Sequence, residues 1–181
     1  MIQPYDLPID KSHLWNIYNR CNRKEKYYNY NIASTTNFFI DDPNDIEYIN
    51  NNIINPLGLG ADKIYIPVDL IANRWDDGPW DNGPGFNFNV VEPGGFVRPH
   101  RDLNTCKINI LLNDTTLAPF HSIATDEKYY YEHPVLLDVS QLHTIDNCES
   151  IVEDRVTLQL FLTAGYEKCE RIINENRTYK K

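Results

Sequence analysis

The sequence contains no apolar run long enough to span a bilayer, because polar residues interrupt its hydrophobic ones at short intervals. The first six residues, MIQPYD, also lack the basic start and the apolar stretch of a secretory signal peptide. From these two absences we expect a soluble, cytoplasmic protein.

Cysteine patterning is equally sparse. The four cysteines are Cys21, Cys106, Cys148 and Cys169, and no two of them form a Cys-x-x-Cys pair. Nothing in this spacing marks an oxidising compartment, so we expect four reduced and mostly buried thiols.

Positive charge is in the minority. The chain has 17 Lys and Arg against 26 Asp and Glu, a net charge of −9 at pH 7. This balance argues against a protein whose main task is to hold a phosphate backbone, so a nucleic-acid partner is not expected. A local basic patch stays open, because charge is spatial. The length of 181 residues, of which 41% are hydrophobic, suits one domain with a substantial core.

Two helices are predicted within residues 1–60, which we interpret as a helical flank. The first covers residues 11–23, and the second begins after Asp42, a good N-cap, with Pro43 at the first helical position. The apolar residues at helical spacing are Leu14, Ile17, Tyr18 and Cys21 in the first helix and Ile46, Ile49 and Ile53 in the second.

From residue 64 onward the hydrophobic period changes to two, as in strands. The strand-like runs are 64–70, 86–90, 96–97, 107–112, 120–124, 129–131, 135–139 and 156–162. Turn-forming residues separate them, and many short strands with frequent turns predict a sandwich or barrel. We expect a single, mainly β domain, a cupin-like double-stranded β-helix (jelly roll) with its core over residues 64–165. The turn-rich segment 74–85, with two tryptophans, is either a substrate wall or an anchored loop.

A candidate metal site comes from three side chains. His100 and Asp102 are two residues apart, so on an extended segment both point the same way. His143 closely follows the strand-like run 135–139. Two histidines and one carboxylate on one side of an ion form the facial triad of non-haem iron(II) oxygenases. Nickel, zinc or manganese would suit the same ligands.

A second candidate site opens the last strand. Alternation places Arg155 and Thr157 on one face of that strand, where a guanidinium fork and a hydroxyl can grip a carboxylate together. Each motif alone is weak: His-x-Asp occurs by chance, His143 suits an interior histidine, and Arg155 could pair with Asp154 or Glu153 at a strand end. The order and spacing of the motifs favour a joint site.

These residues resemble the aspartyl/asparaginyl β-hydroxylases, a family of iron(II)- and 2-oxoglutarate-dependent oxygenases. The resemblance is carried by residues 89–112, NVVEPGGFVRPHRDLNTCKINILL, and by the block from 135 (VLLDVSQLH) through 155–160 (RVTLQL). It implies a double-stranded β-helix that uses iron(II), 2-oxoglutarate and O2. It also implies metal ligation by His100 and His143, and cosubstrate binding by Arg155.

The resemblance assigns three further cosubstrate positions and shows two departures. Asn89 stands at a small polar position that touches the cosubstrate, and Lys107 at a position that is usually basic. Asn109 stands where some members have a second cosubstrate-binding arginine. Asp102 completes a full triad, whereas the animal protein hydroxylases of the family lack that carboxylate.

The expected activity is hydroxylation of an unactivated C–H bond in a protein or peptide side chain of Asp, Asn or Pro type. Two alternatives stay open. The substrate may instead be a free amino acid or small metabolite, or the chain may be a non-catalytic, metal-binding cupin-like module. Arg155 and Thr157 separate these readings, because a metal-binding cupin does not need them. The sequence predicts no particular oligomeric state.

Overall fold

The structure is a computed structural model that describes residues 1–22, 24–29, 32–60, 85–102, 106–113, 118–162 and 164–178. The predicted strand at 64–70 lies outside the described residues, as does nearly all of the tryptophan-rich segment 74–85. No helix in the described ranges is long and apolar enough to cross a membrane.

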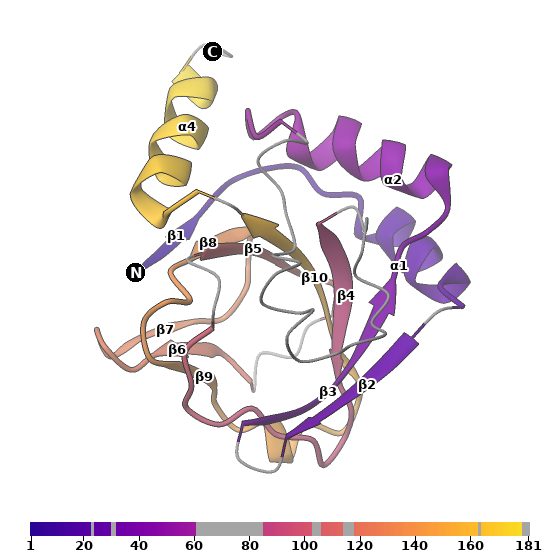
Figure 1. The fold of residues 1–181 in the computed structure, drawn as a ribbon, viewed down its shortest axis with the longest axis vertical. Coiled ribbons are helices and arrows are strands. Elements are labelled where there is room, and N and C mark those ends of the chain that lie inside the picture. Colours follow the sequence, from indigo (N-terminus) through magenta and orange to yellow (C-terminus); the bar gives the residue numbers. More distant parts are fainter. Residues whose placement is uncertain are drawn as a thin grey trace, which may run out of the picture.

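The strands form two antiparallel sheets (Figure 1). The large sheet has the order β1-β8-β5-β10-β4-β3-β2, and the small one β7-β6-β9. The strands of the large sheet are β1 (Ile2–Pro4), β2 (Lys24–Asn29), β3 (Ala33–Phe39), β4 (Phe86–Val91), β5 (Cys106–Leu111), β8 (Val135–Leu137) and β10 (Arg155–Leu162). Those of the small sheet are β6 (Phe120–Ser122), β7 (Glu127–Tyr129) and β9 (His143–Ile145).

The connections between the sheets define the fold. The segment that carries His100 extends the small sheet, because His100 forms an isolated antiparallel bridge with His143 on β9. From β4 onward the chain then passes back and forth: β4, β5, β8 and β10 lie in the large sheet, and the His100 segment, β6, β7 and β9 in the small one. This is the winding of a double-stranded β-helix, so the predicted jelly-roll class is confirmed.

Helices cover one face of the large sheet. They are α1 (Lys11–Arg20), α2 (Pro43–Ile49), which continues as the π-helix η1 (Asn50–Ile54), and α4 (Tyr166–Thr178); the short 3-10 helix η3 spans Cys148–Ser150. The predicted cap is confirmed, since the Asp42 carboxylate accepts a hydrogen bond from the Asn44 amide at 2.8 Å. The first helix ends three residues earlier than predicted, because Cys21 is already extended.

The interpretation of residues 1–60 as a helical flank needs correction, because this region also contributes β1, β2 and β3. The sequence of β3, ASTTNFF, has little apolar alternation, so its own pattern does not reveal a strand. It is a strand because its backbone pairs with β2 and β4. Prediction also missed β9 and α4, although Tyr166, Cys169 and Ile173 are buried at helical spacing.

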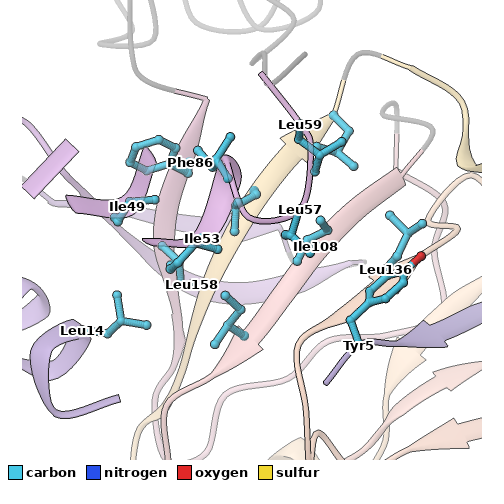
Figure 2. Close-up of a cluster of buried hydrophobic side chains, with 14 of the residues drawn as sticks. Tyr5, Leu14, Ile49, Ile53, Leu57, Leu59, Phe86, Ile108, Leu136 and Leu158 are labelled. Carbon is cyan, nitrogen blue, oxygen red and sulfur yellow. The ribbon is translucent and has the colours of Figure 1, made fainter. Parts of the chain in front are cut away.

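The two faces of the large sheet differ in chemistry, because side chains alternate along each strand. The outward face packs with the helices in one apolar cluster (Figure 2), in which Ile53 of η1 lies against the strand residues Phe86 and Leu158. The inward face of the three central strands is largely polar. Its polar residues are Asn87, Asn89, Lys107, Asn109, Arg155, Thr157 and Gln159. The fold thus places a helix-covered core on one side and a polar barrel interior on the other.

Candidate metal centre and cosubstrate pocket

The structure brings His100, Asp102 and His143 together. One ligand atom of each lies within 4.8 Å of the other two, and no other such group of His, Cys, Asp or Glu occurs among the described residues. Nε2 of His100 is 3.2 Å from Oδ1 of Asp102, and Nε2 of His143 is 3.9 Å from Oδ2. Two imidazoles and one carboxylate at these separations fit a single divalent metal ion.

Backbone pairing fixes this cluster. His100 and His143 each donate an amide hydrogen bond to the other's carbonyl, both at 2.9 Å. The Asp102 amide donates to the Val139 carbonyl at 2.9 Å, which ties the carboxylate to the chain just before β9. Paired backbone segments therefore hold the three side chains together, although His143 is about forty residues from His100 and Asp102 in sequence.

One ring nitrogen of each histidine lies against a backbone carbonyl, and the other faces Asp102. Nδ1 of His100 lies 2.7 Å from the Arg98 carbonyl, and Nδ1 of His143 lies 2.9 Å from the Gln141 carbonyl. A carbonyl only accepts, so Nδ1 donates in each ring, and Nε2 is the nitrogen on the side of Asp102, where a metal would bind. Phe120 stacks on the His143 ring at 5.2 Å and shields it.

The loop before β9 is held by its own hydrogen bonds. The backbone carbonyl of Gln141 holds Nδ1 of His143, and the Asp138 carboxylate accepts hydrogen bonds from the amide and hydroxyl of Ser140.

The electrostatics of the cluster favour its metal-binding protonation state. Burial lowers the pKa of His143 to about 4, so this imidazole is neutral at pH 7. Burial alone would raise the pKa of Asp102, but the charge of Lys107, with help from His100 and His143, holds it below its ordinary value. A neutral His143 and an ionised Asp102 are the forms that bind a metal.

Lys107 lies at the His-Asp-His cluster. Its Nζ is 2.5 Å from Oδ2 of Asp102 and 5.0 Å from the centroid of the Phe161 ring. The sequence placed Lys107 on the cosubstrate, and that role stays a prediction.

Arg155 is a buried cation, only 2% exposed. Its Nη1 donates to the Thr157 hydroxyl at 2.9 Å, and its Nε to the Ala118 carbonyl at 3.3 Å. Its Nη2 is buried without a hydrogen-bond partner, and Arg155 forms no ion pair within the described part of the chain. The pairing with Asp154 that the sequence left open is therefore not seen. A buried guanidinium with a spare donor fits an anionic ligand such as a carboxylate.

The two predicted asparagines lie on the same inward face. Asn89 is the cross-strand neighbour of Thr157, and its Nδ2 donates to Oδ1 of Asn37 at 2.9 Å. Asn109 pairs across the sheet with Gln159, and its Oδ1 is buried with no partner among the described residues. Both therefore stay candidates for contact with a polar ligand inside the barrel.

Sequence reasoning missed Asn87 and Tyr131. Asn87 is 1% exposed, and neither polar atom of its amide has a partner in the described ranges. It alternates with Phe86 and Phe88, so an amide on the inner face of an otherwise apolar strand was a usable signal. Tyr131 lies under Arg155, with its ring centroid 4.8 Å from the Arg155 Cζ. No sequence pattern indicated this contact.

Two other histidines make contacts of a different kind. His13 stacks on Tyr48 with ring centroids 3.8 Å apart. The two ring nitrogens of His121 each lie 3.1 Å from a carboxylate, one from Asp126 and one from Asp146.

Comparison with known proteins adds a distant structural likeness. No protein-family model and no curated protein matches the sequence. Among solved structures, the fold is similar to the crystal structure of a Pseudomonas putida prolyl-4-hydroxylase, with 15% sequence identity and a TM-score of 0.49. The match covers 91% of this chain and 92% of that chain.

Proposed function

We propose that this chain is an iron(II)- and 2-oxoglutarate-dependent dioxygenase that hydroxylates an unactivated C–H bond in a protein or peptide side chain. One observation carries the proposal: a His-Asp-His cluster shares one barrel with Arg155, a buried cation that has an unused donor and no ion pair among the described residues. The cluster alone would suit many metal proteins. The buried arginine is the addition that calls for a carboxylate.

In this proposal each group has a separate task. His100, Asp102 and His143 hold iron(II) on one side and leave its other side open. Bound iron(II), with 2-oxoglutarate and O2, supplies the oxidation of the C–H bond. Arg155 and Thr157 bind the far carboxylate of 2-oxoglutarate, with Asn89 and Asn109 on the same wall. The contribution of these residues is positioning.

Two other functions stay as alternatives. A free amino acid or small metabolite would use the same metal centre and the same arginine, so the alternatives differ only in what stimulates turnover. The substrate types Asp, Asn and Pro are proposals of equal standing. A metal-binding cupin-like module without catalysis would have no use for 2-oxoglutarate, and Arg155 is the residue that discriminates it.

The test measures succinate formation from 2-oxoglutarate by the iron-loaded protein in the absence of a substrate. The wild-type protein is compared with the variant Arg155→Ala. Loss of a buried charge contact with a carboxylate is worth about 2–5 kcal/mol, so KM for 2-oxoglutarate should rise roughly 30-fold or more. Iron affinity should stay unchanged. Arg171→Ala on α4, which removes an exposed arginine far along the chain, is the charge-matched control.

The outcomes separate the alternatives. Unchanged KM in Arg155→Ala would remove Arg155 from the cosubstrate site. Metal binding without any 2-oxoglutarate turnover in the wild-type protein would favour the cupin-like module. If turnover occurs, adding peptides that contain Asp, Asn or Pro, and separately the free amino acids, identifies which class accelerates succinate release.

A further inference from the structure

Tyr131 has a backbone conformation that bulky residues rarely adopt. Its φ is 61°, in the left-handed region, and its side chain is only 4% exposed. The other two non-glycine residues with positive φ in the described part of the chain are Asp126 and Asn147, residue types that tolerate this conformation. Such a conformation in a buried tyrosine persists only where the surrounding contacts require it.

The ring of Tyr131 makes the first of those contacts. The Arg155 Cζ lies 4.8 Å from the ring centroid, within the range of a cation–π interaction. The Ala118 carbonyl and the Thr157 hydroxyl occupy two of the guanidinium nitrogens. Together these three contacts fix the guanidinium and leave Nη2 as the donor available to a ligand.

The hydroxyl of Tyr131 makes the second contact, accepting a hydrogen bond from Nδ2 of Asn109 at 3.4 Å, which leaves Oδ1 of Asn109 buried without a partner among the described residues. The oxygen and nitrogen of an amide have nearly the same shape, so the hydrogen-bond network decides which one faces the hydroxyl. When an anion occupies the barrel, the exchanged orientation suits it better. The Tyr131 hydroxyl then donates to the Asn109 oxygen, and the Asn109 NH2 group takes the position of the unpartnered Oδ1 and offers the anion a neutral donor beside Nη2 of Arg155.

We propose that Tyr131 is a positioning residue for the carboxylate of the cosubstrate, acting through both of its neighbours. Its ring orients Arg155, and its hydroxyl fixes the Asn109 amide with the NH2 group toward the ligand. The inference rests on the proposed function. It explains how a pocket with one buried cation gains a further donor without a second buried charge, and why a strained tyrosine is retained between β7 and β8.

The experiment measures 2-oxoglutarate binding by calorimetry. The protein is loaded with Mn(II), with which we expect it to bind 2-oxoglutarate without converting it to succinate. Tyr131→Phe keeps the ring and should weaken binding by about 2- to 10-fold, the effect of one hydrogen bond. Tyr131→Leu removes both contacts and should weaken it roughly 10-fold or more. The matched control is Tyr129→Phe, because the Tyr129 hydroxyl bonds the backbone of His133 instead.

A double-mutant cycle separates positioning from general stability. Because the hydroxyl acts through Asn109, Tyr131→Phe should have no further effect on 2-oxoglutarate binding in the Asn109→Ala background. Mn(II) affinity should stay within about 2-fold in every variant, the scatter expected for sites that do not interact. This cycle also keeps the test intact if Tyr131→Leu does not fold.

Two results would overturn the positioning role: wild-type affinity in both Tyr131 variants, or fully additive effects of Tyr131→Phe and Asn109→Ala. Failure of the proposed function looks different. In that case the wild-type, Mn(II)-loaded protein does not bind 2-oxoglutarate at all, and the role of Tyr131 falls with it.

Discussion

The Asp102 carboxylate forms an ion pair with Lys107. Its side chain is 18% exposed and that of Lys107 is 13% exposed, and Oδ2 and Nζ are 2.5 Å apart. A largely buried ion pair depends on both partners, since removal of one leaves the other charge desolvated and alone. A divalent metal at the cluster would provide Asp102 with a second source of positive charge.

We therefore predict that Lys107→Met destabilises the metal-free protein by on the order of 3 kcal/mol. Added Mn(II) should restore much of that loss, because the metal then compensates Asp102. Urea unfolding with and without Mn(II) measures both effects. Lys26→Met is the control: it breaks the exposed pair with Glu92, side chains 64% and 49% exposed, and should cost less than about 1 kcal/mol. Equal stability of metal-free Lys107→Met and wild type would contradict this account of Asp102.

His143 makes the metal-free protein sensitive to mild acid. Its pKa falls from 6.5 to about 4 on folding because burial disfavours the charged imidazole. The folded state thus holds His143 neutral. Its contribution to stability is full above pH 6.5 and is lost as the pH falls from 6.5 through 4, up to about 3 kcal/mol in all. Asp102, whose pKa is lowered from 3.8, changes only below this window.

Urea unfolding of the metal-free protein at pH 7, 6 and 5 should therefore show falling stability, with a shallower decline in His143→Asn. An identical pH dependence in the two proteins would show that His143 is not the titrating group.

The strand β10 contributes side chains both to the helix-covered core and to the barrel interior. Its residues Val156, Leu158 and Leu160 are fully buried in the helix-covered cluster, whereas Arg155 and Thr157 face the barrel. Substitutions one position apart should therefore affect different properties.

Leu158→Ala should destabilise the protein by about 2–5 kcal/mol, as expected for a cavity in a packed core, and leave 2-oxoglutarate affinity of the folded protein unchanged. Thr157→Val removes the hydroxyl that accepts from Arg155 at 2.9 Å. Because one buried hydrogen bond is lost, 2-oxoglutarate affinity should weaken several-fold, and the free energy of unfolding should fall by about 1–2 kcal/mol. Urea unfolding and 2-oxoglutarate titrations of both variants measure these effects. If Leu158→Ala weakened 2-oxoglutarate binding more than Thr157→Val does, the assignment of Leu158 to the core face and Thr157 to the barrel face would be wrong.

The elements predicted from the sequence are those whose own pattern was strong. The N-cap at Asp42 and the alternating strands β4, β5 and β10 carry local signals and were found. The strand β3 was missed because pairing with β4, at Asn37↔Asn89 among other positions, decides its conformation. Such long-range pairing leaves little trace in the sequence of the strand itself.

At the scale of the whole molecule, the winding of the chain between two sheets assembles the site. The order and spacing of His100, Asp102, His143 and Arg155 along the sequence led us to expect a joint site, and the fold brings His100, Asp102 and His143 to one place. The supporting groups were not predictable in the same way. Tyr131 reaches Arg155 through a left-handed turn between strands, a conformation that no propensity of tyrosine indicates.

The central claim is that His100, Asp102 and His143 hold iron(II) with a face left open for 2-oxoglutarate. The most direct test is to add iron(II) and then 2-oxoglutarate to the metal-free protein without oxygen and record the visible spectrum. We expect the weak charge-transfer band of a chelated keto acid. The band should saturate at one equivalent of iron and be absent from His143→Ala. Metal binding with no band in the wild-type protein would contradict it and point to a metal-binding module without this chemistry.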